Sequence, residues 1–483
     1  MLVKRAAGLG LGALVASFAL ACGCGSEERA GPAGTGGVAD GGGTGGTGAG
    51  GGGTGGGLGA SGGAPGGGAG GTGGGCPGGS PPSDAPPDWE LYTGYCDCPI
   101  WIPGKQGKMP DPVEWEPCPS PGPLVASCKR MKTPWTKTTA LSHAFYPVFW
   151  FDKANGRAVL QFARTYLDDD KSNKRRLRLV ADLDGPILNA FFEDSTSCTL
   201  SEQSVQGGRY AFGVTPTTPP PKPEQIEGVV AGEIGKPVPG TGLASHVENL
   251  YANWRASSGW LIRWQSGLTG RHWGSDQVVQ IQKASLDPEG ELPYGPRAVG
   301  DTVFWEVGGQ TKHGVVSWTE ASGQQNLIRW LGDYTQGAGN FNTDGVDMVW
   351  SHGTGKAPSA SKYPTVSIKT APFTTDPAVR KAKEKRLRSD PGQLGVTPFG
   401  VGCGYASHTF DDDTTNSVDL LVVRLSDGVS WVVKAPPVST GVMFMNALGT
   451  SCSDVFTQVQ FPDEANAIVR IPLSALGPAI PPD

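Results

Sequence analysis

Charged residues are scarce in this chain, and long hydrophobic runs are missing beyond its N-terminus. Of its 483 residues only 17% are charged, and the net charge is −6 at pH 7. A coiled coil or a mainly helical bundle needs far more charge, Ala and Leu, so both are excluded. No apolar run of about 18 residues lies beyond residue 25, which excludes an internal membrane helix. The acidic balance argues against a general nucleic-acid binder.

Catalytic signature motifs are also missing outside the Gly-rich stretch described below. The rest of the sequence has no G-x-S-x-G nucleophile elbow, no phosphate-binding loop, no dinucleotide fingerprint and no H-E-x-x-H zinc motif. The six histidines are scattered, with no pair at metal-ligand spacing. Catalytic residues therefore stay unknown at this stage, and no cofactor is expected.

The N-terminus has the pattern of an export signal. Lys4 and Arg5 precede an apolar stretch that ends in Ala19-Leu20-Ala21-Cys22, so residues 1–21 are predicted to be a signal peptide. The ending resembles a bacterial lipobox, which would make Cys22 the lipidated first residue of an outer-membrane lipoprotein. Ala19 and Ala21 also fit an ordinary signal-peptidase site, which would give a freely secreted protein.

A Gly-rich stretch follows, with 30 glycines among residues 31–79. Such a composition cannot bury enough apolar surface to fold, so residues 22–83 are predicted to be a lipidated Cys and a disordered tether with a span of roughly 40 Å. Lipobox, tether and a Cys- and Trp-rich β domain together resemble the cell-envelope lipoproteins of myxobacteria. That resemblance implies an envelope partner, a membrane reached through the lipid anchor, and a monomer.

The cysteines predict disulfides, because an exported chain meets an oxidising compartment. Cys24 falls in the tether, and eight cysteines remain as candidates without an assigned pairing. A Cys- and Pro-rich segment, residues 84–134, contains several of them, and zinc binding by Cys96, Cys98, Cys118 and Cys128 is the alternative. The eight are Cys76, Cys96, Cys98, Cys118, Cys128, Cys198, Cys403 and Cys452.

An internal repeat predicts the fold of residues 135–483. The pattern G-x4-W-x2-G begins at Gly259, Gly300 and Gly345, at spacings of 41 and 45 residues. Weaker copies keep part of the pattern. Repeats of this length, each with a signature strand and a hairpin, predict an all-β fold, a single β-propeller with four strands per blade. Seven units, at 145, 207, 259, 300, 345, 400 and 449, predict seven blades, and six or eight also fit.

The blade pattern resembles TolB-like and WD-type propellers, without the Trp-Asp dipeptides of the latter. The repeated Trp264, Trp305 and Trp350 are expected to pack between blades. Cys403 and Cys452 share one repeat position, which predicts neighbouring equivalent strands. The run 466–472 is expected to close the ring by completing the first blade.

One loop resembles a calcium site. Asn340, Asn342, Asp344 and Asp347 space oxygen ligands around Gly345, as in the D-x-N-x-D-G loop of integrin-type propeller repeats. Asn340 replaces the first Asp, and Asp347 comes one residue early. A simple Asn-Asp-Gly turn is the alternative.

Other polar groups are weaker candidates. His352 and His408 are predicted to share a repeat position near the central axis. Two Asp triplets, 168–170 and 411–413, lie in predicted connections. Two basic runs, 171–178 and 380–388, are expected either to contact anionic polysaccharide or lipid head groups or to protect outer strands from edge pairing.

The sequence favours a non-catalytic binding or scaffolding module for an envelope protein or a glycan. The alternatives are a carbohydrate-active hydrolase or lyase with carboxylates at the propeller channel, and a purely structural role. Raised carboxyl pKa values at the channel mouth would favour the enzyme, whereas an exposed aromatic patch would favour binding.

Overall fold

The computed structural model describes residues 88–482, apart from several connecting segments. The predicted signal peptide, Cys22 and the Gly-rich tether lie outside the described residues, as do Cys76, Cys96 and Cys98. Within the described part of the chain, no helix is both long and apolar enough to span a bilayer.

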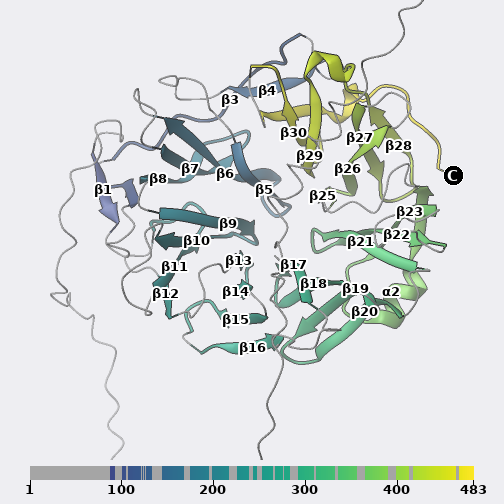
Figure 1. Ribbon diagram of the computed structural model, residues 1–483, viewed down its shortest axis with the longest axis horizontal. Coiled ribbons are helices and arrows are strands. Elements are labelled where there is room, and N and C mark those ends of the chain that lie inside the picture. Colours follow the sequence, from purple (N-terminus) through teal and green to yellow (C-terminus); the bar gives the residue numbers. More distant parts are fainter. Residues whose placement is uncertain are drawn as a thin grey trace, which may run out of the picture. The chain divides into compact units, whose positions relative to one another are not determined.

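The chain folds into seven antiparallel sheets that form a seven-bladed β-propeller (Figure 1), which confirms the predicted fold. Each predicted repeat falls in a different sheet. The strands of the first three blades, from the innermost outward, are β5 (Ala144–Asp152), β6 (Arg157–Leu167), β7 (Lys174–Asp182) and β8 (Ile187–Asp194); β9 (Cys198–Gln206), β10 (Arg209–Pro216), β11 (Ile226–Glu233) and β12 (Leu243–His246); β13 (Asn253–Ala256), β14 (Trp260–Trp264), β15 (Leu268–His272) and β16 (Val279–Gln282).

Blades 4 to 7 continue in chain order, and blade 5 adds a short helix, α2 (Pro377–Lys383), before its last strand. Their strands are β17 (Leu292–Val299), β18 (Thr302–Gly308), β19 (Lys312–Thr319) and β20 (Gly323–Leu331); β21 (Gln336–Thr343), β22 (Asp347–Thr354), β23 (Thr365–Pro372) and β24 (Lys385–Ser389); β25 (Gly400–Gly402), β26 (Tyr405–Asp412), β27 (Ser417–Arg424) and β28 (Ser430–Val433); β29 (Met443–Thr450), β30 (Asp454–Gln460) and β31 (Ala467–Pro472).

Consecutive blades pack against one another all the way around the ring. β5 contacts β9, β9 contacts β13, β13 contacts β17, β19 and β20 contact β21, β21 contacts β25, β25 contacts β29, and β29 returns to β5. The hydrophobic core therefore lies between adjacent sheets rather than at one centre. Between blades 3 and 4, for example, Trp260 and Ile262 pack with Val303 and Trp305.

The N-terminal segment closes the ring. Its first hairpin, β1 (Trp89–Tyr92) and β2 (Ile100–Pro103), extends blade 1 beyond β8. Its second hairpin, β3 (Glu114–Pro117) and β4 (Lys129–Lys132), pairs with β31 and completes blade 7. We call residues 88–132 the N-terminal clasp. The Cys- and Pro-rich segment thus contributes strands to the propeller.

The expected role of the C-terminal strand is wrong. β31 is the third strand of the last blade and pairs with β30 on one side and β4 on the other. The N-terminal clasp and β31 therefore meet in blade 7, because β3 and β4 supply the outer part of that blade and β31 does not extend blade 1.

Polar bonds fix the clasp across the boundary of blades 7 and 1. The indole Nε1 of Trp115 donates to the carbonyl of Leu183 at 3.1 Å. Arg470 of β31 donates to Asp184 of blade 1 at 2.5 Å and to Asp454 of its own blade at 3.0 Å. A disulfide joins Cys118 to Cys128 across the β3–β4 hairpin, which confirms that these two candidates form a disulfide, although their pairing was not predicted.

Candidate functional site

The turns between the first and second strands of the blades form one continuous face. We call it the turn face, made of residues 153–156, 207–208, 257–259, 300–301, 344–346, 403–404 and 451–453. The turns of neighbouring blades touch at three boundaries, those of blades 2 and 3, blades 3 and 4, and blades 6 and 7. Ser257 Oγ donates to the carbonyl of Gly300 at 2.9 Å, and Thr450 Oγ1 at the end of β29 donates to the carbonyl of Gly402 at 2.6 Å. The face is therefore built from interlocked turns.

This interlocking explains the repeated glycine. A Cβ atom at Gly259 would lie 2.7 Å from the carbonyl oxygen of Gly300 in the next blade, and one at Gly207 would lie 2.6 Å from the amide nitrogen of Ser258. At Gly300 the reason is conformational, since its φ of 57° is in the left-handed region that favours glycine. The glycine thus marks where one turn meets another or where the turn itself needs a left-handed residue.

The repeated tryptophan packs between blades at all three positions, as predicted, and at two of them it faces the preceding blade. Trp305 and Trp350 are each the fourth residue of the second strand, and both are at most 1% exposed. Trp305 packs toward blade 3 and Trp350 toward blade 4. Phe212, also fourth in its strand, packs toward blade 1 in the same way.

Trp264 departs from this pattern. Its strand begins directly after Gly259, so Trp264 is the fifth residue of β14 and packs toward blade 4 instead of blade 2. A slip of one residue along a strand moves a side chain to the opposite face of the sheet. The weaker copy at Gly400 and Tyr405 is out of register as well, because Gly400 lies within β25 and Tyr405 begins β26.

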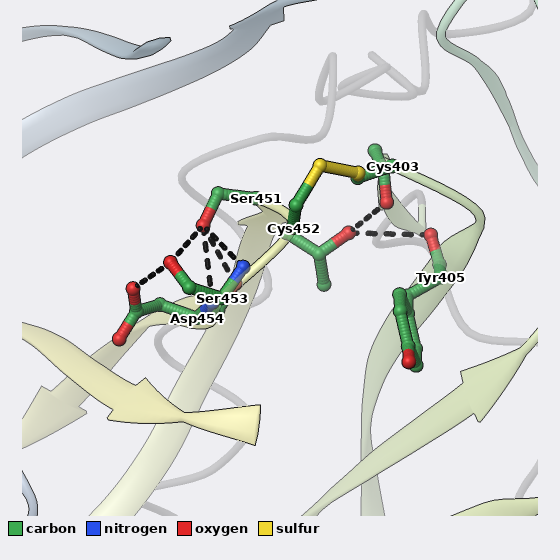
Figure 2. The surroundings of a disulfide bond; sticks show 8 residues. Cys403, Tyr405, Ser451, Cys452, Ser453 and Asp454 are labelled. Atoms are coloured by element: carbon green, nitrogen blue, oxygen red, sulfur yellow. Dashed lines mark hydrogen bonds between the residues drawn. A yellow bond between two sulfur atoms is a disulfide. The ribbon is translucent and has the colours of Figure 1, made fainter. Parts of the chain in front are cut away.

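A disulfide joins Cys403 of blade 6 to Cys452 of blade 7 (Figure 2). The two cysteines lie at equivalent turns of adjacent blades, which confirms their predicted neighbouring positions, and the structure adds the pairing. Beside it, Ser451 Oγ accepts from the backbone N–H groups of Ser453 and Asp454 at 3.3 and 3.0 Å. Covalent and hydrogen bonds together fix this part of the turn face.

The boundary of blades 4 and 5 holds a carboxyl group that the sequence did not single out. Glu306 of β18 is half-buried, and its Oε1 accepts from the backbone N–H of Phe341 on β21 at 2.9 Å. Burial raises the pKa of Glu306 to about 7, against the opposing charge of Arg297 and that hydrogen bond. Glu306 can therefore hold a proton near neutral pH. The available signal was its place directly after a buried Trp, on the opposite face of the strand.

Hydrogen bonds of backbone and amide groups also join blade 5 to blade 6. Asn340 has a φ of 58° and sits in a bulge of β21 opposite Trp350. The N–H of Phe399 donates to the carbonyl of Asn340 at 3.2 Å, and the Asn342 amide donates to the carbonyl of Phe399 at 2.5 Å. Blades 4, 5 and 6 are thus linked near their first strands.

The predicted calcium loop has the hydrogen bonds of a turn. Asp344 Oδ1 accepts from the N–H groups of Val346 and Asp347, both at 2.9 Å, and Asn342 Oδ1 accepts from the N–H of Thr343 at 2.9 Å. Asn340 is buried. Burial, and then the neighbouring Asp344, raise the pKa of Asp347. These bonds are those of the Asn-Asp-Gly turn, and calcium binding stays a prediction.

The two histidines do not share a repeat position, so that prediction is wrong. His408 is the fourth residue of β26, the position that Trp350 has in β22, whereas His352 is the sixth residue of β22. Both are buried on second strands, and the His408 ring lies 5.0 Å from that of Phe399. Burial, aided by Lys369, lowers the pKa of His352 to about 4, so it is neutral at physiological pH.

The other candidates are distributed unevenly. Asp411 and Asp412 end β26, Cys198 begins β9, and residues 168–170 lie outside the described ones. In the first basic run, Arg178 is buried and pairs with Glu193 at 3.1 Å, so it is a core residue. Among the described residues, no three His, Cys, Asp or Glu side chains gather as they would around a metal ion.

No protein-family model matches the sequence, and no curated protein does. Solved structures with similar folds do. A prolyl endopeptidase matches with a TM-score of 0.43 and 13% identity over 78% of this chain, which spans 54% of the endopeptidase. The match therefore spans about half the length of that enzyme.

Two further structures illustrate the range of similar proteins. The β-propeller domain of the trilobed protease from Pyrococcus furiosus matches with a TM-score of 0.40 and 12% identity, over 70% of this chain and 100% of that domain. The GH93 α-L-arabinofuranosidase of Fusarium graminearum matches with a TM-score of 0.27 and 10% identity, over 58% and 95% of the two chains. The seven sheets of the chain itself define its class, a seven-bladed β-propeller.

Proposed function

We propose that this protein is an exported propeller, anchored in the cell envelope by a lipid on Cys22, that acts as a non-catalytic binding or scaffolding module. Its partner would be an envelope protein or a glycan. The observation that supports this proposal is the interlocked turn face. Turns joined by hydrogen bonds, close backbone contacts and a disulfide form a surface that is ordered before a partner arrives.

Pre-ordering matters because a flexible surface must lose conformational entropy when it binds. The exposed side chains on the turn face differ from blade to blade, so the face is chemically varied although its backbone repeats. Such a surface suits recognition of one specific shape. The exposed residues include Lys153, Asn155, Ser258, Asp301 and Val346.

Binding is tested by a thermal-shift screen of the full chain against envelope polysaccharides and purified envelope proteins. We expect a saturable shift with one of them. Asp301→Arg on the turn face should abolish the shift, whereas Glu90→Arg, an equally exposed charge reversal on the clasp, should keep it. A panel without any shift would contradict the binding proposal.

The anchor is tested separately, by fatty-acid labelling and membrane fractionation. The parent chain should incorporate the label and sediment with membranes, and Cys22→Ala should do neither. A parent chain that is secreted without label would show free export instead.

One observation favours a second function, a carbohydrate-active hydrolase. Glu306 carries a pKa of about 7, which is the property that a general acid needs at neutral pH. Glu306→Gln keeps an acceptor for the Phe341 N–H but removes the proton. If the parent cleaves a bound polysaccharide and this variant binds it without cleavage, the enzyme function replaces the binding module.

A further inference from the structure

Blade 5 differs from the other blades in the connection between its third and fourth strands. In blade 6 this connection is a short turn, residues 425–429, whereas in blade 5 it is residues 373–384 and contains α2. Added structure on a repeated scaffold is where specific contacts are usually made. Figure 1 shows α2 on the outer side of blade 5, beside β20 and β23.

Hydrogen bonds and ion pairs fix both ends of α2. Asp376 caps α2 by accepting from the N–H groups of Ala378 and Val379 at 2.7 and 3.3 Å. Glu384 accepts from Lys369 at 2.6 Å and also pairs with Arg380. The Arg380 guanidinium lies 5.8 Å from the centre of the Trp350 ring. Both acidic residues of the segment are therefore used within it.

The remaining charges are positive and exposed. Residues 376–389, which we call the basic rim, hold six Lys or Arg and two acids, in a chain whose net charge is −6. Lys381, Lys383, Lys385 and Arg386 are exposed, and Val379 among them is 45% exposed. The helix buries none of its residues. Cationic side chains around an exposed apolar one are typical of surfaces that contact lipid head groups.

Protection of an outer strand explains only part of this pattern. Lys385 and Arg386 lie on β24, the outermost strand of blade 5, where charges discourage edge pairing. Lys381, Lys383 and Val379 lie on α2, which has no strand edge to protect. The other basic run behaves differently, since its Arg178 is buried against Glu193.

We infer that the basic rim docks onto the anionic lipid head groups of a membrane. This inference builds on the proposed lipid anchor. The proposed anchor would keep the propeller near a membrane, and a basic patch would add an electrostatic contact of the propeller itself with anionic head groups. Each Lys or Arg near an anionic leaflet strengthens binding by about fivefold. The exposed Val379 favours a lipid surface over a soluble polyanion.

The test is co-sedimentation of the full chain carrying Cys22→Ser with vesicles of phosphatidylcholine, with and without phosphatidylglycerol. Because the anchor is removed, the result reports on the propeller alone, and its failure is distinguishable from failure of the anchor or of turn-face binding. We expect binding to the anionic vesicles only, weaker at about 0.15 M salt than at low salt. Equal binding to neutral vesicles, or none to either, would overturn the inference.

Charge reversal supplies the decisive comparison. Lys381→Glu/Lys383→Glu/Lys385→Glu should weaken vesicle binding by about 100-fold or more, because three attractions become repulsions. Lys108→Glu/Lys129→Glu/Lys236→Glu changes the net charge equally at exposed sites outside the rim and the turn face and should bind within a few-fold of the parent. Comparable losses in the two variants would overturn the inference.

A last arm separates lipid from glycan. Val379→Ser should reduce vesicle binding several-fold and leave binding to a soluble acidic polysaccharide unchanged. If the polysaccharide binds as tightly as the vesicles and Val379→Ser has no effect on either, the rim is a glycan site and the lipid inference fails. Circular dichroism of each variant checks that the fold is kept.

Discussion

The two boundaries of blade 7 are held by different means. Toward blade 6, the boundary carries the Cys403–Cys452 disulfide and the hydrogen bond from Thr450 to Gly402. Toward blade 1, where the chain ends meet, the described contacts are non-covalent. There Phe149 stacks on Phe456 with ring centres 5.3 Å apart, Trp115 bonds to Leu183, and Arg470 bonds to Asp184.

This difference shows how a ring can be closed without a covalent bond at the closure itself. Blade 7 combines three C-terminal strands with two N-terminal ones, so it depends on both ends of the chain. The disulfide fixes blade 7 to its sequence neighbour, and the clasp then needs to add only the last boundary. The covalent bond thus limits how far the ring opens if the clasp releases.

The largest effect is expected from removing the covalent boundary. Cys403→Ser/Cys452→Ser opens a crosslink with a sequence separation of 49 residues, and chain entropy assigns such a loop about 4 kcal/mol. Urea unfolding of parent and variant measures this loss.

The hairpin disulfide is the matched control. Cys118–Cys128 closes a separation of 10 residues, for which the same relation gives about 3 kcal/mol. If Cys118→Ser/Cys128→Ser cost more than the longer crosslink, the clasp would be the principal support of the ring.

The non-covalent boundary is tested at Trp115. Trp115→Ala removes the bond to Leu183 and the contacts with Phe456 and Arg470. Because the side chain is only half-buried, we expect a loss of about 2 kcal/mol, below the range for a fully buried aromatic. Hydrogen exchange should show faster exchange in β3, β4 and β31 and little change in blades 3 to 5.

A conservative variant divides that effect. Trp115→Phe keeps most of the packing but not the indole N–H, so its cost should be about 1 kcal/mol. Uniform acceleration of exchange in all blades would show that the ring opens as one unit and that the two boundaries are not independent.

The sequence could predict the repeat and the blade number because each blade buries the same kind of second strand. It also placed Cys403 and Cys452 on neighbouring equivalent strands, from their shared repeat position, although it assigned no disulfide pairing. It could not show which neighbouring blade Trp264 faces, because a pattern that counts residues from a glycine does not record where the strand begins, and one residue decides the face.

Two features could not be predicted because they depend on contacts between distant residues: the closure of the ring and the raised pKa of Glu306. Pairing of β4 with β31 joins residues 130 and 469, and no local pattern carries such a distant contact. Glu306 acquires its pKa from burial against the next blade and from the backbone of Phe341. Neither is visible in the residues next to it.

The boundary of blades 4 and 5 adds a pH-dependent case. Burial raises the pKa of Glu306 from 4.5 to about 7, so folding favours the protonated form. Its contribution to stability is complete below about pH 4.5 and is lost as the pH rises through 7. Glu306→Gln should therefore flatten the decline in melting temperature between pH 5 and 8.

At acidic pH, the contribution of His352 to stability changes with pH in the opposite direction, and this part of the profile serves as the control. The pKa of His352 is lowered from 6.5 to about 4, so its contribution is lost as the pH falls from 6.5 to 4. Glu306→Gln should leave the profile unchanged below about pH 4.5, where the Glu306 carboxyl is protonated in the folded and the unfolded chain. A parent and variant with parallel profiles above pH 5 would show that Glu306 is ionised in the folded protein.

The smallest expected effect separates the two components of the covalent boundary. Thr450→Val removes the hydroxyl that bonds to Gly402 in a fully buried site and should cost about 1 kcal/mol, whereas Thr450→Ser should cost less. In the Cys403→Ser/Cys452→Ser background the turns of blades 6 and 7 are free to separate, so the same substitution should cost measurably less. Urea unfolding of the full double-mutant cycle gives this coupling. An unchanged cost would mean that the hydrogen bond survives without the disulfide, and that the two boundaries of blade 7 differ in covalency but not in rigidity.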